Sequence, residues 1–381
     1  MSLVTQKSVG SEAPSPRIII APDSFKGTAS AQQAAEWIGE GVRSVIRDAD
    51  ITLIPMADGG EGTSTLFAGE RITLPTTDAS GRLTEATYTY DAESQTAFID
   101  VAAATGLPAV ADNPVPLTGD TYGTGVLIAD AETRGATRIV LGLGGSATVD
   151  GGTGILVALG ANPLDQAGYQ LKPGGGALSK LGDLDTAKVN IPAGSLEWHL
   201  LIDVASPATG PTGAAAVFGP QKGASPEDVN ILDAGLARLC EVAGVAPATP
   251  GMGAAGGVAI GITWLSSLLH GDASHVHLLP GARTVAEANG LADAVKGASL
   301  VITGEGRFDA QTEAGKVVAT VCELAQQGGD DAPVVAVASG SFEGETPEGV
   351  LAVKLEDVAD TREQLVRAGK QAAVAYLNAG A

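Results

Sequence analysis

An acid, a hydroxyl and a lysine follow the first strongly apolar segment of the chain in close order. Asp23, Ser24 and Lys26 come directly after Ile18–Ile20, whose β-branched side chains are typical of a strand that is covered on both faces. Either these residues form a turn that leads into a helix, or the strand end holds a charged ligand. We take Lys26 as a candidate catalytic residue, and Asp23 and Ser24 as candidates for binding substrate or phosphate.

Two carboxylates within four residues suggest a metal site. Asp58 and Glu61 lie in the glycine-rich stretch ADGGEGT, again after an apolar run. Magnesium is commonly held by one or two carboxylates, waters and substrate phosphates, so we predict these two acids on the metal side of a site. Helix capping is the alternative, and it explains one acid better than two. Asp203, also a catalytic candidate, and Glu305, also a candidate for binding substrate or phosphate, are the reserve acids.

The segment Gly142–Gly154 concentrates glycines around a serine and an acid. Exposed backbone N–H groups in such a loop surround phosphate oxygens without long basic side chains. We therefore predict that Gly144, Gly145 and Ser146 form a cradle for a phosphate or a carboxylate, and that Asp150 orients a hydroxyl group. A glycine-rich turn that serves only the packing of a strand on a helix explains the composition equally well.

Basic residues are scarce, so their settings carry information. Lys26, Lys222 and Lys316 each adjoin a glycine, and Arg307 lies in the stretch GEGRFDAQT. Basic groups at strand ends would neutralise the oxygens of a phosphoryl group in transfer. Lys26 and Arg307 are the catalytic candidates, and Lys222 and Lys316 are candidates for binding substrate or phosphate. The alternative for each lysine taken singly is a solvated surface residue.

The elements that would position these residues follow a repeated strand–turn–helix order. Short apolar runs end in glycine-rich or charged turns, and helical stretches follow several of them. Ser30 with Gln33 matches a capping box, and Ser225-Pro226 places a cap before a first-turn proline. This order predicts an α/β fold with a parallel sheet, in which ligands bind at the carboxyl ends of the strands.

Residues 71–101 break this order, because they read as three short strands joined by tight turns, an antiparallel meander. The later strand-like runs near Leu300 and Val334 resemble the first two. We therefore expect a first domain from residues 17–70 and 280–381, with a mixed α/β domain, residues 71–279, inserted into it. Residues 1–16 are expected to be a disordered leader.

The composition argues against several classes of protein. With 22 basic and 44 acidic residues, the net charge of −22 disfavours binding to nucleic acid or to an anionic membrane. Cys240 and Cys322 suit reduced, buried thiols. No signal peptide or membrane-length apolar run is evident, so we expect a cytoplasmic protein. The histidines show no convincing ligand spacing, and HVH at 275–277 suggests a strand edge.

Six stretches, in chain order, resemble the signature motifs of the bacterial glycerate kinase family. They run from about residue 17 to the C-terminus and read APDSFKG, PMADGGEGT, GLGGSAT with DGG, FGPQKGA, PG-GAAGG and ITGEGR-D-QT--GK. The resemblance implies an enzyme that uses ATP and Mg²⁺ to phosphorylate D-glycerate, with the 2-hydroxyl favoured over the 3-hydroxyl. It also implies two α/β domains, one of them flavodoxin-like, with the active site in the cleft between them.

The chain departs from the family pattern at two places. Val149 stands where the family usually has Asn, and Ser206-Pro207-Ala208 stand where Asn-Pro-Leu is typical. Polar substrate contacts at these positions are therefore not carried over from the family, and a related hydroxy acid is an open alternative as the substrate.

Two other classes of protein also stay open at this stage. A nicotinamide-dependent hydroxy-acid oxidoreductase is suggested by the match of Gly251–Gly256 to GxGxxG, but no strand-like run precedes that match. A non-catalytic protein that binds sugar acids is disfavoured by the clustering of acids with lysines. The sequence leaves both a monomer and a homodimer open.

Overall fold

The computed structural model describes residues 15–308, 316–329, 332–343 and 349–379. The predicted leader therefore lies, up to residue 14, outside the described residues. The chain divides into two compact units. The first holds the described residues of Met1–Ile54, Ala292–Phe308 and Cys322–Ala381, and the second holds those of Pro55–Leu291 and Asp309–Val321. The predicted domain ranges, 17–70 with 280–381 and 71–279, stay a prediction.

The first unit contains a five-stranded, fully parallel sheet in the order β13-β12-β11-β1-β2. Its strands are β1 (Arg17–Ile20), β2 (Asp50–Leu53), β11 (Leu300–Glu305), β12 (Val334–Ser339) and β13 (Val350–Lys354). Numbered within this sheet alone, the order is 2-1-3-4-5, which is the flavodoxin-like arrangement. The predicted flavodoxin-like fold with a parallel sheet is confirmed.

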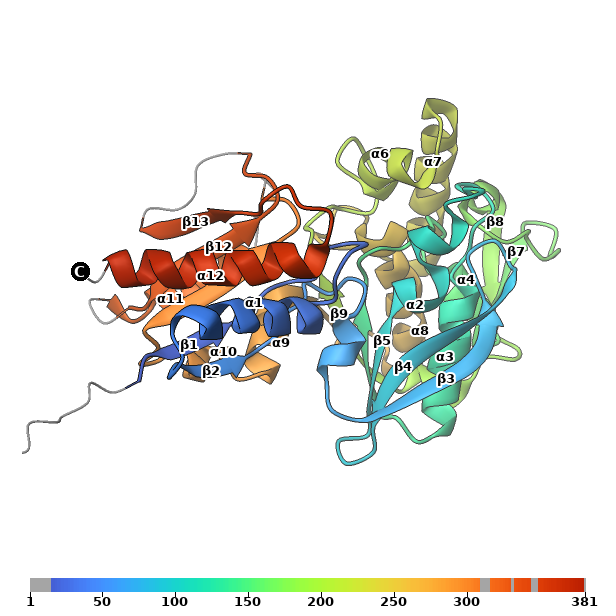
Figure 1. The fold of residues 1–381 in the computed structure, drawn as a ribbon. Helices are drawn as coiled ribbons and strands as arrows, with labels where there is room; N and C mark the ends of the chain where they lie inside the picture. Colours follow the sequence, from blue (N-terminus) through green and yellow to red (C-terminus); the bar gives the residue numbers. More distant parts are fainter. Residues whose placement is uncertain (1–14, 309–315, 330–331, 344–348, 380–381) are drawn as a thin grey trace, which may run out of the picture. The chain divides into compact units, whose positions relative to one another are not determined.

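Two long helices of the first unit pack against each other along this sheet, α1 (Ala31–Val45) and α12 (Thr361–Ala379) (Figure 1). The first begins at Ser30, whose side chain forms the expected capping box with Gln33. The two helices approach closely at Gly41, where a Cβ atom would lie only 2.0 Å from the carbonyl oxygen of Val366. Two further helices, α10 (Leu291–Ala294) and α11 (Val317–Gln326), begin in residues assigned to the second unit and end in residues assigned to the first.

The second unit contains a six-stranded mixed sheet in the order β10-β9-β6-β5-β4-β3. Its strands are β3 (Glu70–Thr77), β4 (Leu83–Asp91), β5 (Thr96–Asp100), β6 (Arg138–Gly142), β9 (Glu197–Ile202) and β10 (Val276–Pro280). The strands β5, β6, β9 and β10 are parallel, while β4 pairs antiparallel with β3 and β5. The predicted antiparallel meander is therefore confirmed.

Helices and one small hairpin surround this second sheet (Figure 1). The helices are α2 (Val101–Thr105), α3 (Tyr122–Thr133), α4 (Thr153–Ala158), α5 (Ile191–Gly194), α6 (Ala214–Phe218), α7 (Pro226–Ala243), α8 (Val258–His270) and α9 (Gly281–Ala288). The hairpin pairs β7 (Asn162–Asp165) with β8 (Leu181–Asp185). The helix α7 begins as the sequence predicts, with Ser225 as its cap and Pro226 in its first turn.

Both cysteines are buried and free, as expected: Cys240 lies in the core of the second unit, and Cys322 lies on α11. Burial raises the pKa of each thiol to about 11, so both are protonated near neutral pH. Among the described residues, no helix combines the length and apolar character that crossing a membrane requires.

Candidate active site

The first group of candidate residues lies at the carboxyl ends of β1 and β11. The parallel sheet reverses its winding between these two strands, which is where ligands bind in folds of this class. The backbone N–H of Asp23 donates a 2.9 Å hydrogen bond to the carbonyl of Gly304, which extends the pairing beyond the strands. The carboxylate of Asp23, which is 9% exposed, accepts a hydrogen bond from the N–H of Ser24 at 2.6 Å. Both residues are therefore held at the reversal point.

Lys26 lies at the tip of a tight turn in this region. Phe25 is buried, and its N–H donates a 2.9 Å hydrogen bond to the carbonyl of Ala29, which closes the turn. The Lys26 side chain is exposed and forms no ion pair with another described residue. Its ammonium group is therefore available to a ligand.

Glu305 and Arg307 lie at the end of β11 and just beyond it, in the first unit. Glu305 is the last residue of that strand and pairs in register with Ser339. The guanidinium of Arg307 lies 2.6 Å from the carboxylate of Glu343, and both side chains are more than half exposed. An exposed ion pair of this kind contributes only ~0–1 kcal/mol, so a phosphorylated ligand would readily compete for the arginine. Lys316 directly precedes α11 and is partly buried.

In the second unit, two glycine-rich loops pack backbone against backbone. The N–H of Gly144 donates a 2.9 Å hydrogen bond to the carbonyl of Gly59. A Cβ atom on Gly144 would lie 2.6 Å from the Cα of Gly60, and one on Gly59 would lie 2.9 Å from the carbonyl oxygen of Leu201. Close packing of the loops thus requires glycine at these positions. Gly145 needs glycine for a different reason, since its φ is +74°.

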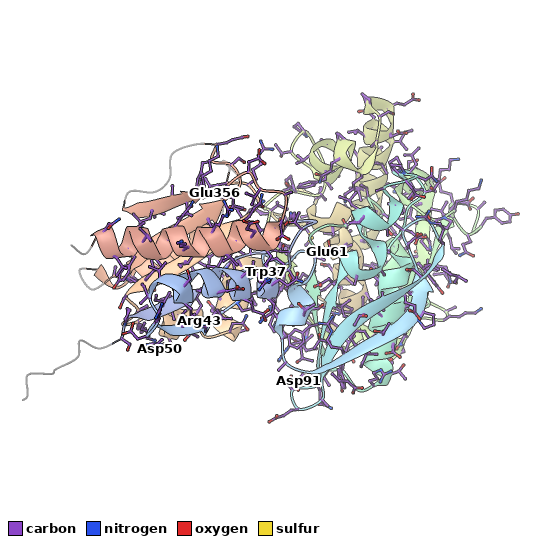
Figure 2. The ribbon with its side chains drawn as sticks, in the orientation of Figure 1. Trp37, Arg43, Asp50, Glu61, Asp91 and Glu356 are labelled. Atoms are coloured by element: carbon purple, nitrogen blue, oxygen red, sulfur yellow. The ribbon has the colours of Figure 1, made fainter. Side chains whose placement is uncertain are left out.

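Asp58 and Glu61 lie on the first of these two loops. The Oδ1 atom of Asp58, a side chain that is only 8% exposed, accepts a 3.1 Å hydrogen bond from the N–H of Gly60. The loop passes the start of α9 so closely that a Cβ atom on Gly281 would lie 2.0 Å from the carbonyl oxygen of Asp58. Glu61 is exposed (Figure 2). Asp203 directly follows β9, whose residue Leu201 touches the same loop.

Sequence reasoning missed Asp100, the acid that fastens this loop. Its carboxylate accepts hydrogen bonds from the N–H of Gly62 at 3.0 Å, and from the N–H and the hydroxyl of Ser64, both at 2.9 Å. Burial raises the pKa of Asp100 to about 6, against the lowering effect of these bonds. Its position at the end of the apolar strand TAFID is a signal like the one that pointed to Asp23 and Asp203, which follow apolar runs.

Asp150 is fully buried and anchors the second glycine-rich loop. Its carboxylate accepts four hydrogen bonds: from the N–H and the hydroxyl of Thr121 at 2.9 and 2.8 Å, and from the N–H groups of Gly152 and Gly154 at 3.2 and 2.9 Å. Three of these bonds go to the Oδ2 atom and one goes to Oδ1. These contacts fix the start of α4.

Lys222 is buried beneath the same loop. Its ammonium donates hydrogen bonds to the hydroxyl of Ser146 at 2.9 Å and to the carbonyl of Thr148 at 2.7 Å. Desolvation lowers the pKa of Lys222 to about 7, although the charge of Asp150 opposes the shift. The side chain therefore ties the loop to the start of the segment that leads into α7, and a solvated surface lysine is excluded for this position.

At the two places where the chain departs from the family pattern, the residues contribute to the packing and the backbone hydrogen bonds of the second unit. Val149 is fully buried in the hydrophobic core of the second unit. The carbonyl of Ser206 accepts a 2.9 Å hydrogen bond from the N–H of Gly253, and Ala208 is fully buried.

The fold and these loops are typical of an α/β protein that binds a small anion, and the exposed Lys26 lies near the reversal point of the parallel sheet. The model of the glycerate kinase family matches residues 18–375. A glycerate kinase of Bacillus subtilis is 41% identical over 333 residues, which are 84% of each chain. A glycerate 2-kinase of Escherichia coli is 38% identical over 321 residues, 82% of each chain.

A solved structure supports the same relationship. It is that of a Salmonella typhimurium protein assigned as glycerate kinase 2, with a TM-score of 0.77 and 34% sequence identity, and the match covers 96% of this chain and 99% of that one. The chain belongs to the glycerate kinase family and is an enzyme of the kinase class, with ATP as its co-substrate. The oxidoreductase and binding-protein alternatives receive no support from these matches.

Proposed function

We propose that this enzyme transfers the γ-phosphoryl group of ATP to the 2-hydroxyl of D-glycerate. The observation that carries the proposal is the reversal point of the flavodoxin-like sheet, where Asp23, Ser24 and Lys26 follow β1 and Glu305 ends β11. This is the position at which folds of this class bind ligands. The similarity to named glycerate kinases over most of the chain supports glycerate as the substrate.

Charge neutralisation is the main task in this reaction, because the phosphoryl group passes through a loose transition state with little covalent chemistry for the protein to perform. Lys26 is exposed, and Arg307 forms an exposed ion pair with Glu343. We assign both to the charges of the phosphoryl group and of the substrate carboxylate. Glu305 and Lys316 are proposed as additional binding residues, with Asp23 and Ser24 orienting the substrate.

A magnesium ion would be held by Asp58 and Glu61. Magnesium prefers oxygen ligands and usually keeps several waters, so one or two carboxylates suffice. Only the Oδ1 atom of Asp58 accepts a hydrogen bond from a described residue, which leaves Oδ2 for a cation. Glu61 is exposed and lies on the same loop, which the hydrogen bond from the N–H of Gly62 to Asp100 fastens. The ion would neutralise phosphate charge, and Asp203 is the reserve ligand.

The glycine-rich loop of Gly144, Gly145 and Ser146 is proposed to face the substrate or phosphate. Lys222 and Asp150 support it from the interior, since both are buried. Lys222 donates to Ser146 and Thr148, and Asp150 ties the N–H groups of Gly152 and Gly154 to Thr121. In this proposal Asp150 acts indirectly. It fixes the conformation of the loop, and the loop in turn orients the hydroxyl group of the substrate. We further propose that the two compact units are the two domains of the kinase and that the enzyme works in the cytoplasm.

Phosphorus NMR of the product of ATP and D-glycerate tests the reaction directly. We expect a Mg²⁺-dependent signal from 2-phosphoglycerate, and none when EDTA replaces the metal. A 3-phosphoglycerate signal would show that the enzyme phosphorylates the 3-hydroxyl group and not the 2-hydroxyl group. If the purified enzyme gave no phosphoglycerate at all, while it phosphorylated another hydroxy acid, the substrate assignment would fail and the kinase class would stand.

A further inference from the structure

All four histidines of the chain gather around one glutamate in the second unit. Glu197 begins β9, His199 lies two residues further along that strand, and His277 lies opposite His199 on β10. The cluster is completed by His275, just before β10, and by His270, whose ring stacks on that of His275 with centroids 3.7 Å apart. None of these residues has a role in the proposed phosphoryl transfer.

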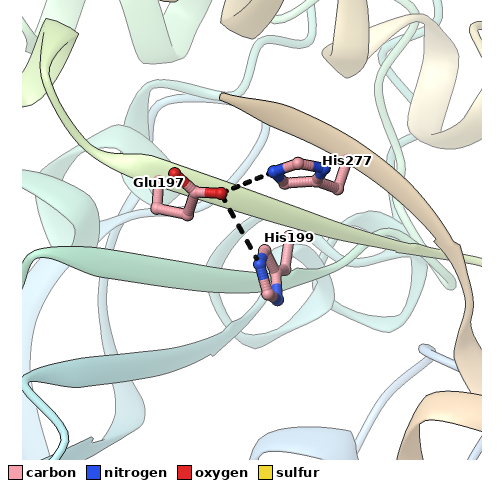
Figure 3. Close-up of side chains that lie close together, drawn as sticks. All are labelled: Glu197, His199 and His277. Carbon is pink, nitrogen blue, oxygen red and sulfur yellow. Dashed lines mark hydrogen bonds and ion pairs between the residues drawn. The ribbon is translucent and has the colours of Figure 1, made fainter. Parts of the chain in front are cut away.

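The geometry of a parallel sheet explains why three of these side chains converge. Residues two apart on a strand point to the same face, so Glu197 and His199 share a face while Trp198 points into the core. The register pairs His199 with His277, which brings the second imidazole to the same face (Figure 3). The edge strand β10 begins within the HVH stretch, at Val276, and its pairing with β9 places His277 beside His199.

The distances between the polar atoms suit a single small cation. The Oε1 atom of Glu197 lies 2.5 Å from Nε2 of His277 and 4.0 Å from Nε2 of His199 (Figure 3). One ligand atom of each residue lies within 4.8 Å of the other two. In a tetrahedral zinc site, bonds of ~2.0–2.1 Å place neighbouring ligand atoms roughly 3.3 Å apart. The observed separations bracket that value, so small side-chain rotations complete the site.

A metal ion can reach the two imidazoles and the carboxylate from solvent, since the three side chains are 28–39% exposed.

We propose that Glu197, His199 and His277 bind one Zn²⁺ ion, with water in the fourth position. Two imidazoles and one carboxylate are a ligand set that zinc accepts, whereas Mg²⁺ prefers oxygen alone. The Nδ1–H of His275 donates a 2.9 Å hydrogen bond to the second oxygen of Glu197 and orients the carboxylate. The site lies where β9 and β10 begin, and the glycine-rich loops lie where the neighbouring strands end. The ion therefore joins the edge strand β10 to its neighbour β9, and it takes no part in phosphoryl transfer.

Metal content measured on untagged enzyme tests this proposal. After dialysis against Zn²⁺ and removal of the free metal, mass spectrometry of the metal should find one zinc per chain. Co²⁺ in its place should give the visible absorption of a site with nitrogen and oxygen ligands. His199→Gln with His277→Gln should lower the zinc affinity at least 100-fold. The matched control is His270→Gln, which changes a histidine of the cluster that is not a ligand, and it should bind zinc as the parent does.

Thermal unfolding separates loss of the site from loss of the fold. Zinc should raise the melting temperature of the parent and of His270→Gln, and it should not raise that of the double variant, whose metal-free melting temperature should match the metal-free parent. A parent that binds no zinc, or a double variant that binds it equally well, would overturn the proposal. Either result leaves the kinase assignment untouched, because Mg²⁺-dependent turnover is measured separately.

Discussion

Lys222 donates a 2.9 Å hydrogen bond to the hydroxyl of Ser146 across 76 residues of sequence, and both side chains are buried. A second hydrogen bond, of 2.7 Å, joins the same ammonium to the carbonyl of Thr148. A charged group is thus built into the interior under the loop that we place next to the substrate. Its pKa of about 7, set by desolvation, makes its protonation sensitive to pH in the neutral range.

This burial predicts how Lys222 affects stability as the pH changes. The folded pKa of about 7 lies below the ordinary value of 10.5, so between these values the unfolded chain binds more protons. The contribution of Lys222 to the free energy of unfolding is therefore smallest below pH 7 and rises through that window. In urea unfolding, the free energy of the parent minus that of Lys222→Met should grow between about pH 7 and about pH 9.5. A difference that is independent of pH contradicts the depressed pKa.

Lys26→Met should lower turnover by roughly 10²–10³-fold, the typical effect of removing one preorganised electrostatic contact. The methionine keeps most of the apolar stem, and the side chain is exposed, so the stability should change by no more than about 0.5 kcal/mol. Lys26→Arg should restore turnover only in part, because the planar guanidinium differs in shape and reach.

Lys180→Met is the matched control for Lys26, because it removes another exposed lysine that has no proposed role. It should leave both turnover and melting temperature unchanged. If Lys26→Met had the kinetics of the parent, the assignment of Lys26 to the active site would be wrong, and Lys26 would be only an exposed residue of a surface turn.

Arg307→Met is expected to lower turnover strongly with little effect on stability. The chain offers a close control in Arg362, which forms a similarly exposed ion pair with Glu40 in the same unit. Loss of either surface pair costs ~0–1 kcal/mol, so both variants should unfold near the parent temperature. Steady-state kinetics should then distinguish them, since only Arg307→Met loses a phosphoryl contact. Equal kinetics in the two variants would show that Arg307 is only a surface residue.

Asp58→Asn should raise the Mg²⁺ concentration needed for half-maximal turnover, because a neutral amide is a weaker magnesium ligand than a carboxylate. Its amide oxygen still accepts the hydrogen bond from Gly60, so the fold should persist. Asp91→Asn is the control, since Asp91 accepts an equivalent bond from Glu93 in the exposed hairpin turn (Figure 2). An unchanged magnesium titration in Asp58→Asn would leave this acid with a capping role alone.

Gly144→Ala should destabilise the protein by about 1–3 kcal/mol, since a methyl group there meets backbone atoms that do not move easily. The new Cβ would lie 2.6 Å from the Cα of Gly60. Gly306→Ala is the control, because a Cβ there has no neighbour within 4 Å and no strained φ. Denaturant unfolding of both variants measures the difference. Equal stabilities would mean that the two loops separate at no cost.

The sequence by itself determined the fold class, because the evidence for it is local. The β-branched run Ile18–Ile20 is a buried strand, and the caps at Ser30 and Ser225 start helices where their side chains predict them. The three strands of the meander follow from alternation and turn residues between 71 and 101. The ordered motifs also identified the family before any contact was known, since each is a short continuous stretch.

Only the tertiary structure decided which polar residues meet and which are buried. Lys222 reads as one more lysine beside a glycine, and its burial follows from packing against a loop 76 residues earlier. Glu197 and His277 come together because β9 pairs with β10 in one particular register, across 80 residues. Spacing along the chain carries no information about such a pairing, since a shift of one residue would turn the histidines to the opposite face of the sheet.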